Sequence, residues 1–233
     1  MGVQTGNYSD TPKLYYKPKN VNKERPCFQK SVREGEEPET CNFIIANLFN
    51  IERSTYTHEG VEHQKINYFF TDDEGTEVVS LSGGWPTFYN KDWLNRLANF
   101  DGSIKKIKIL LWDSEDKEKD KHYTRGSIQE ETSHNVFSKV KGKYPYEEIP
   151  KVKWEEYKGT KIKDDEENNK FFEGVLDQVM TKLQFRSVDK VKAYYQGIEK
   201  PESKLNEQAK KNFNNKPVTA GADDDEYDDD VPF

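Results

Sequence analysis

Three segments near the start of this chain alternate apolar and polar residues with a period of two, and this pattern constrains the fold more than any other feature. The segments are 41–52, 64–71 and 76–82. Successive side chains of a β-strand point to opposite faces of a sheet, so each segment is expected to be a strand with one buried face. The turn sequence at 72–75, Asp-Asp-Glu-Gly, predicts that the second and third strands form a hairpin.

A short helix and two further strands are expected next. Gly-Gly-Trp-Pro at 83–86 should end the third strand, and Asn90 should cap the helix that follows. Strands are then predicted at 103–113 and 121–128. Three strands, a helix and two strands are the order of the five-stranded Greek-key oligonucleotide-binding fold (OB-fold), whose helix lies between strands three and four. Other small β-barrels and α+β folds share this order, so a mainly β OB-fold barrel is the leading expectation among several.

The rest of the chain is expected to elaborate this barrel. A small hairpin is predicted at 151–157 and 160–163, and an amphipathic helix at 168–183, which packs against the barrel or a second subunit. The apolar stripes of the two helices contain Trp93, Leu97 and Phe100 in the first, and Phe172, Val175, Leu176, Val179 and Leu183 in the second. The chain is divided into an N-terminal arm at 1–40, an OB-fold domain with added helices at 41–195, a linker at 196–222 and an acidic tail at 223–233.

Formal charge is unevenly distributed along the chain. The segment 223–233 holds seven of the 43 acidic residues and no basic one, so residues 1–222 carry 36 of each sign. Within that neutral body, 1–33 has an excess of five positive charges, and 103–163 and 185–217 have four each. Basic stretches beside one acidic arm predict binding to a polyanion, for which the arm competes. Ordinary solvated charges are the alternative interpretation.

The acidic segment cannot bury enough apolar surface to fold alone, so it is expected to be a solvated tail. It closes with Asp228, Asp229, Asp230, Val231, Pro232 and Phe233. This ending resembles the tip of bacterial single-stranded DNA-binding proteins, Asp-Asp-Asp-Ile-Pro-Phe, with Val231 in place of Ile. Phage replication proteins of this class also end in an acidic run and Phe. The resemblance implies an OB-fold and a tip that binds a polymerase, a helicase–primase or a recombinase; a solubilising tail without partners is the alternative.

Candidate contacts for a single DNA strand combine aromatic rings, which stack on bases, with cations, which follow the phosphates. They come from a loop at 85–91, from the non-core face of the second strand and from matching faces of the last two strands. The predicted DNA-binding residues are Lys65, Phe69, Trp85, Phe88, Tyr89, Lys91, Lys106, Lys108, Trp112, Tyr123 and Arg125. Any one of these aromatic residues could instead belong to the core.

Motifs of enzymes and metal sites are missing from the sequence. It has no P-loop, Gly-x-Ser-x-Gly or His-Glu-x-x-His string, and Cys27, Cys41 and the four histidines lack zinc-ligand spacing. The acidic pairs at 72–73 and 164–165 are interpreted as a hairpin turn and a helix start, with a two-metal nuclease as the alternative. We therefore expect no catalysis, metal or cofactor. Without a signal peptide or an 18-residue apolar run, a cytoplasmic protein with no membrane contact is expected, in a bacterial host if it is phage-encoded.

Together these patterns predict a non-catalytic single-stranded DNA-binding protein, similar to those of tailed phages. It would coat unwound DNA in replication, recombination or repair and recruit enzymes through its tail, either as a monomer or as a homodimer. Two alternatives stay open: a decoy or DNA mimic that uses the acidic tail without binding DNA, and an RNA-binding barrel. A mimic should be acidic throughout, which the neutral body argues against.

Overall fold

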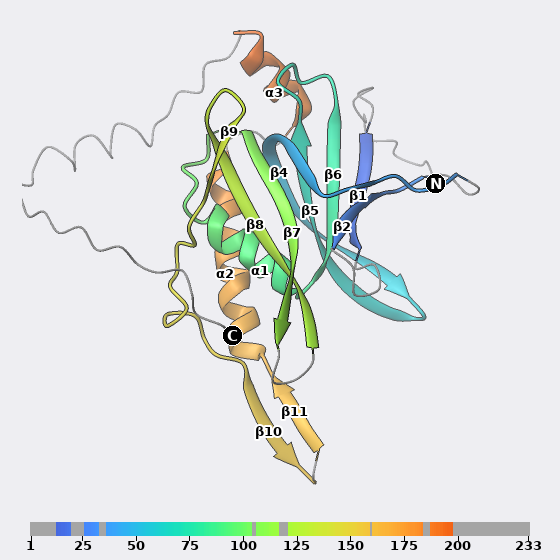
Figure 1. Cartoon of the computed structure of the whole chain (residues 1–233), viewed down its shortest axis with the longest axis vertical. Helices are drawn as coiled ribbons and strands as arrows, with labels where there is room; N and C mark the ends of the chain where they lie inside the picture. Colours follow the sequence, from blue (N-terminus) through green and yellow to red (C-terminus); the bar gives the residue numbers. More distant parts are fainter. Residues whose placement is uncertain are drawn as a thin grey trace, which may run out of the picture.

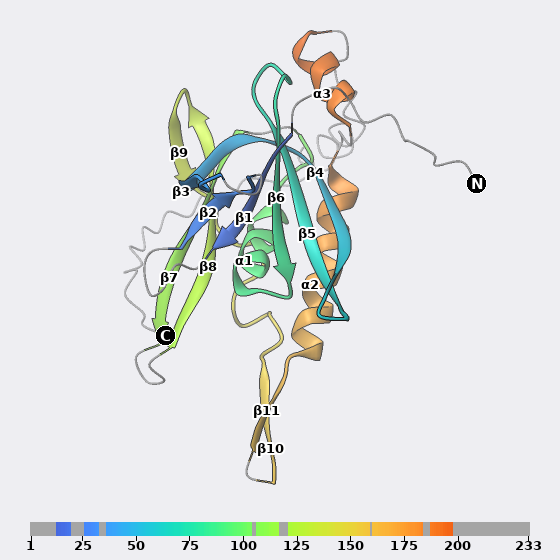
Figure 2. The same cartoon turned by 90° about the vertical axis from the view of Figure 1, so that its right-hand side faces the viewer.

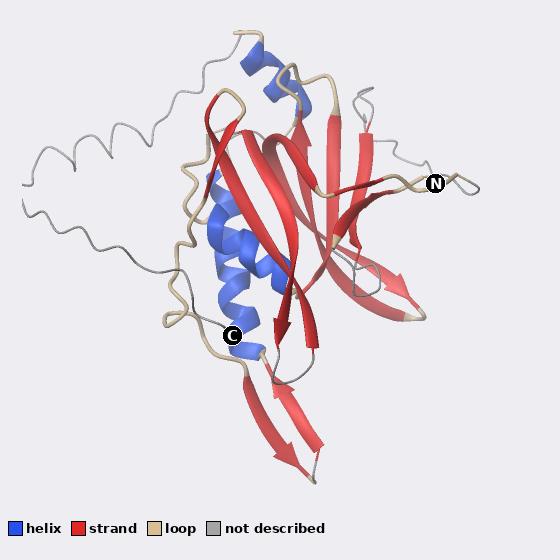
Figure 3. Ribbon diagram, viewed as in Figure 1, coloured by secondary structure: helices blue, strands red, loops and turns tan. Residues whose placement is uncertain are grey.

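The computed structural model describes residues 13–19, 26–32, 36–103, 106–116, 121–158, 160–183 and 187–197. Within these ranges the protein is mainly β, as predicted, with one large mixed sheet, a separate two-stranded hairpin and three helices (Figures 1 and 3). The sheet runs in the order β3-β2-β1-β6-β5-β4-β7-β8-β9, and β10 and β11 form the hairpin. The elements are β1 Lys13–Lys19, β2 Cys27–Lys30, β3 Thr40–Cys41, β4 Phe43–His58, β5 Val61–Thr71, β6 Val78–Trp85, α1 Phe88–Leu97, β7 Lys106–Asp116, β8 Lys121–Ser133, β9 Val136–Lys139, β10 Lys153–Tyr157, β11 Thr160–Asp164, α2 Glu166–Lys182 and α3 Val188–Tyr195.

The centre of the sheet is organised around the long strand β4. Its first residues, from Phe43 to Asn47, pair antiparallel with β7, whereas Asn47 to His58 pair antiparallel with β5. A register shift between Leu48 and Asn50 lies where the partner changes, and such a bulge bends and twists a strand locally. β6 then pairs with β5, and β8 with β7. Two antiparallel hairpins therefore flank one shared strand.

The N-terminal segment that was predicted as an arm contributes strands to the interior of the sheet. β1 pairs in parallel with β6 and antiparallel with β2, so it is not an edge strand. Phe28 of β2 is completely buried, and its ring centroid lies 6.1 Å from that of Trp93. The many Lys, Asn and Pro residues around these short strands obscured their contribution to the core. In the described part of the chain no pairing of β6 with β8 closes a five-stranded barrel, and β1 occupies the second edge of β6.

The Gly-Gly-Trp sequence extends β6, although it was expected to end that strand. Gly83 pairs with Ile66, and Trp85 pairs with Gln64. A Cβ atom on Gly83 would lie 2.9 Å from Cε2 of Tyr89, closer than side chains tolerate. Glycine at this position therefore lets helix α1 approach the strand, which is a common reason for glycine inside a strand.

Asn90 lies inside α1 and is not its cap, because the N-cap residue is Thr87. Tyr68 Oη donates a hydrogen bond to Asn90 Oδ1 at 3.0 Å, and Asn90 Nδ2 donates to the Gly84 carbonyl oxygen at 2.7 Å. Buried polar groups require such partners, so the Asn90 amide joins α1 to β5 and β6. An asparagine side chain can cap a helix or form hydrogen bonds inside the core, and only the tertiary contacts show which role it has.

The helices complete the core around the curved sheet (Figure 2). α1 packs against β8 and α2, and α2 packs against β4. The predicted apolar stripes of α1 and α2 are confirmed, since every residue named for them is buried in one cluster with the inner face of the sheet. α3 covers a second, smaller cluster in which Val188 and Val191 contact Phe49 and Val78.

Candidate nucleic-acid interface

Side chains from four elements meet beside the start of α1 and form what we call the aromatic–basic cluster: Phe88, Trp112, Tyr123, Arg125 and Lys163. Strand pairing places Trp112 of β7 opposite Arg125 of β8. The rings of Phe88 and Tyr123 meet edge to face with centroids 5.2 Å apart. The Arg125 guanidinium carbon lies 5.8 Å from the Phe88 centroid and 5.9 Å from that of Trp112. Lys163 Nζ also lies 5.9 Å from the Phe88 centroid.

Four of the eleven residues predicted to contact DNA thus belong to one cluster. Phe88 and Trp112 keep 40% and 46% of their surface exposed, which is unusual for large aromatic side chains. Exposed rings beside cations can stack on flat π-systems while the cations contact negative charge. This cluster therefore has the chemistry that binding to a nucleic-acid single strand requires.

The cation of Arg125 is held in a fixed orientation by Asp92 of α1. Arg125 Nε and Nη2 donate to the two carboxylate oxygens at 2.7 and 2.8 Å. This hydrogen bonding raises the pKa of Arg125 above its usual value. The paired guanidinium still lies within 6 Å of the centroids of two neighbouring rings, although part of its charge is neutralised.

Sequence reasoning missed two residues of this region, Lys163 and Trp154. Both lie on the β10–β11 hairpin, which projects from the body of the protein (Figures 1 and 2). Trp154 pairs directly with Lys163, so the two side chains share one face, and Trp154 is 59% exposed. The hairpin itself was predicted, and pairing its strands symmetrically about residues 158–159 would have placed these two residues side by side.

A cavity of about 280 Å³ opens next to the cluster, between α1, β8 and β11. The first residues of α1 contribute to it, and their first turn carries no acidic side chain, so the positive end of this helix faces the cavity unneutralised. Its remaining walls combine rings, hydroxyls and cations. The lining residues are Pro86, Thr87, Phe88, Tyr89, Lys91, His122, Tyr123, Thr124 and Lys163.

The predicted pair Lys106 and Lys108 lies on the outer face of β7, as expected from the alternation. Lys108 Nζ lies 4.3 Å from the ring centroid of Phe43, which is 45% exposed. Lys106 Nζ donates to Asp73 at 2.6 Å, and this bond lowers the pKa of Asp73 and raises that of Lys106. Lys108 is therefore the more accessible cation for a ligand, because Lys106 already has a carboxylate partner.

Two further predicted residues, Lys65 and Trp85, line a second cavity of about 510 Å³ between the β4–β5 hairpin and α2. Lys65 Nζ lies 6.0 Å from the ring centroid of Tyr56, which stacks on His63 with centroids 5.2 Å apart. Arg53 also lines this cavity, but it forms an ion pair with Asp177 of α2 at 3.0 Å. The cavity thus supplies a second group of rings and cations, lined by residues other than those of the first cavity.

Three predicted contacts lie where a DNA strand would not reach them directly. Lys91 belongs to α1 and not to a loop, and it is only 8% exposed. Phe69 packs against the small cluster under α3, and Tyr89 is partly buried with its ring 5.1 Å from that of Trp93. The prediction of a loop at 85–91 was wrong for Tyr89 and Lys91, because the helix starts three residues earlier than a cap at Asn90 implied.

The acidic tail and its tip, Asp228 to Phe233, lie outside the described residues, so the structure gives no account of them. Among the residues that are described, no group of three His, Cys, Asp or Glu side chains is arranged to hold a metal ion. The helices of this same part of the chain are too short or too polar to cross a membrane.

Comparison with known proteins gives no relative: the chain matches no family model, no curated protein and no solved structure. The geometry of the site must therefore carry any functional conclusion.

Proposed function

We propose that this protein binds single-stranded DNA without sequence preference and has no catalytic role. The observation that carries the proposal is the aromatic–basic cluster, in which each ring or cation, drawn from four elements, lies within 6 Å of at least one other member. Base stacking contributes roughly 1–3 kcal/mol per base and tolerates any sequence, and the cations supply the contacts to phosphate. Trp154, Lys108 and Phe43 would extend this surface along a longer stretch of strand.

The arrangement of the central strands supports an OB-like interpretation of the fold. The sheet contains β6-β5-β4-β7-β8 in that order, with α1 between β6 and β7 in sequence. An OB-fold has the same five strands in the order 3-2-1-4-5, with its helix between strands three and four. In this interpretation β1 pairs with the edge of β6 that would meet strand five in a closed OB barrel.

The acidic tail fits this function as a regulator and as an adaptor. Its seven carboxylates would compete with DNA phosphate for the cations of the cluster. Binding of DNA would release the tail, and its Asp-Asp-Asp-Val-Pro-Phe sequence would then recruit a polymerase, a helicase–primase or a recombinase. The protein would thereby coat unwound DNA and deliver it to replication and recombination enzymes, in the cytoplasm of a bacterial cell if it is phage-encoded.

Fluorescence anisotropy with labelled oligo(dT), oligo(rU) and a DNA duplex tests the proposal. We expect oligo(dT) to bind most tightly, with an affinity that falls steeply as salt is raised because counterions are released from phosphates. Equal or tighter binding to the duplex would contradict it, and preference for oligo(rU) would indicate an RNA-binding protein. No binding to any of the three would favour a decoy or mimic that acts through the tail.

A further inference from the structure

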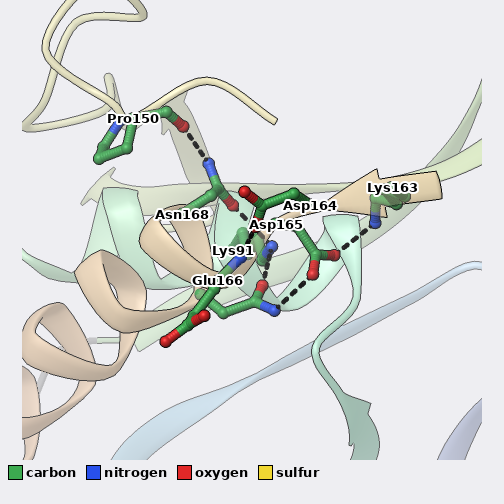
Figure 4. Close-up of polar contacts among 8 residues, drawn as sticks. Lys91, Pro150, Lys163, Asp164, Asp165, Glu166 and Asn168 are labelled. Carbon is green, nitrogen blue, oxygen red and sulfur yellow. Dashed lines mark hydrogen bonds and ion pairs between the residues drawn. The ribbon is translucent and has the colours of Figure 1, made fainter. Parts of the chain in front are cut away.

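Lys91 lines the cavity beside the aromatic–basic cluster, but it is too deeply buried for direct contact with DNA. Lys91 Nζ donates to Asn168 Oδ1 and to Asn169 Oδ1, both at 2.6 Å (Figure 4). It also lies 5.9 Å from the ring centroid of Phe172. Its hydrogen-bond partners are neutral amides, so no carboxylate cancels its charge by direct contact. Removal from water is costly for an ammonium group, and it lowers the pKa of Lys91 to about 8 although the nearby Asp165 carboxylate acts in the opposite direction.

Polar contacts connect this buried cation to the exposed one in the cluster. Asn169 Nδ2 donates to Asp165 Oδ1 at 3.1 Å, and Lys163 Nζ donates to Asp165 Oδ2 at 2.5 Å. Asn168 Nδ2 holds the preceding loop by donating to the Pro150 carbonyl oxygen at 2.6 Å. α1, α2 and the base of the β10–β11 hairpin are therefore joined through Lys91 (Figure 4).

The balance of charge at the cavity depends on Lys91. Lys163 and Asp165 form an ion pair and cancel each other. His122, another lining residue, lies 2.5 Å from Asp113, so that pair adds no net positive charge. Lys91 is thus the cation of the lining whose direct hydrogen-bond partners are neutral amides, and at 8% exposure its charge is screened less than that of a solvated ammonium group.

We propose that this cavity is a phosphate-binding subsite in which Lys163 contacts the phosphate and Lys91 adds positive charge from its buried position. A bound phosphate replaces Asp165 as the hydrogen-bond partner of the Lys163 ammonium. The positive charge of Lys91 then stabilises both the released Asp165 carboxylate and the phosphate. Lys91 also holds Asn168 and Asn169 of α2 beside the cavity, so it is a positioning residue. As part of a DNA strand the phosphate would lie next to Phe88 and Tyr123, which rests on the proposed function.

Two variants and one control test the subsite in anisotropy measurements with oligo(dT). Lys91→Met should lower the affinity roughly fivefold at 0.1 M salt and reduce the log–log salt slope by about 0.7, the value of one phosphate contact on a single strand. Asp165→Asn keeps an oxygen for Asn169 and a good cap for α2, but it frees Lys163, so the affinity should rise. Lys190→Met removes one exposed charge on α3 and should leave both quantities unchanged.

The pH dependence separates an electrostatic role from simple loss of structure. Lys91 changes from mostly charged at pH 7 to mostly neutral at pH 9, so affinity for oligo(dT) should fall over this interval in the wild type and stay flat in Lys91→Met. The other titratable groups at the cavity, Lys163, Asp165, His122, Tyr89 and Tyr123, are present in both proteins, so the difference isolates Lys91. Equal affinity, slope and pH profile in the two proteins, or no gain in Asp165→Asn, would overturn the inference.

Inorganic phosphate distinguishes failure of the subsite from failure of the proposed function. In the wild type the side-chain CεH₂ resonances of Lys163 should shift with inorganic phosphate and not with chloride at equal ionic strength. Lys91→Met should lose this response. Phosphate binding without oligo(dT) binding would overturn single-strand binding and keep the subsite, whereas oligo(dT) binding with no phosphate response would overturn the subsite.

Discussion

Arg125 and Asp92 form a two-point ion pair across the interface of β8 and α1. The guanidinium donates to both carboxylate oxygens, at 2.7 and 2.8 Å, and the backbone N–H of Gly126 donates to one of them at 3.0 Å. Asp92 is only 15% exposed in its side chain, so it depends on these three donors. Arg125 thus fixes the helix to the strand and presents a cation to the aromatic rings of the cluster at the same time.

Arg125→Ala is expected to weaken both the fold and DNA binding. It leaves the Asp92 carboxylate with one donor, at a cost of about 1–3 kcal/mol in unfolding free energy. The lower half of that range applies, because the Arg125 side chain is 39% exposed and solvent screens the pair. Urea unfolding measures the loss, with Lys139→Ala on the exposed edge strand β9 as the control. Wild-type stability in Arg125→Ala would show that the ion pair is only a surface contact.

Trp112→Ala should lower affinity for oligo(dT) by the value of one stacked base, about 1–3 kcal/mol, without unfolding the protein. The indole is 46% exposed, so its removal leaves only a small defect in packing. Val136→Ala, at a similarly exposed apolar position on β9, is the matched control. Anisotropy at fixed salt measures the change, and an unaltered dissociation constant would place the stacking surface elsewhere.

Lys108→Ala tests whether Lys108 contacts DNA phosphate, since its ammonium lies over the Phe43 ring whereas that of Lys106 is paired with a carboxylate. We expect weaker binding to oligo(dT) and a salt slope reduced by about 0.7, because one phosphate contact is lost. Lys106→Ala should have a smaller effect on binding, since its ammonium is already paired with Asp73 at 2.6 Å. An equal or larger effect of Lys106→Ala would mean that the ion pair opens when DNA binds.

The sequence predicted the central strands and the two core helices because each carries an apolar period, and it predicted the small hairpin from the turn residues at 158–159. It did not predict β1 and β2, because these strands are short and contain few large apolar residues such as the buried Phe28. In the candidate site, alternation placed Trp112, Tyr123 and Arg125 on matching faces correctly. It could not show that Arg125 is paired, because its partner Asp92 lies 33 residues away in the sequence. It could not show that Lys91 is buried against α2, because Asn168 and Asn169 lie 77 and 78 residues away.

The burial of Lys91 should appear in the pH dependence of stability. In the unfolded chain its pKa is near 10.5, and in the folded protein it is about 8. Between these values the unfolded state binds more protons, so the stability from this group rises as pH increases from about 8, by up to about 3 kcal/mol in total. The rise should be followed below pH 10, because the raised pKa of Tyr68 and Tyr89 makes the folded state lose stability above that point.

Lys91→Met is the control for this effect. It removes the desolvated charge but leaves Asn168 Oδ1 and Asn169 Oδ1 without their donor, so its stability at pH 7 should lie within about 2 kcal/mol of the wild type. Urea unfolding at pH 7, 8 and 9 should show stability increasing in the wild type relative to the variant. A constant difference between the two proteins would mean that Lys91 is not desolvated in solution.

Deletion of 223–233 should increase affinity for single-stranded DNA and abolish recruitment of partner enzymes. The deletion removes seven carboxylates that compete with phosphate for the cations of the cluster. The gain should be largest at low salt, because a solvated charge is screened within about 10 Å at 0.1 M. Anisotropy with oligo(dT) at several salt concentrations measures the first effect, and pull-down of the replication polymerase, helicase–primase or recombinase measures the second.

Phe233→Ala separates the two roles of the tail. All seven carboxylates remain, so affinity for oligo(dT) should stay close to that of the wild type. Partner binding should be lost, because Phe233 is the one large apolar ring in the Asp-Asp-Asp-Val-Pro-Phe sequence that a partner pocket could enclose. Tyr227→Ala, which removes a ring just before this sequence, is the matched control and should keep partner binding. If Phe233→Ala still binds the partner enzymes normally, the tail acts only through its charge and the adaptor role is wrong.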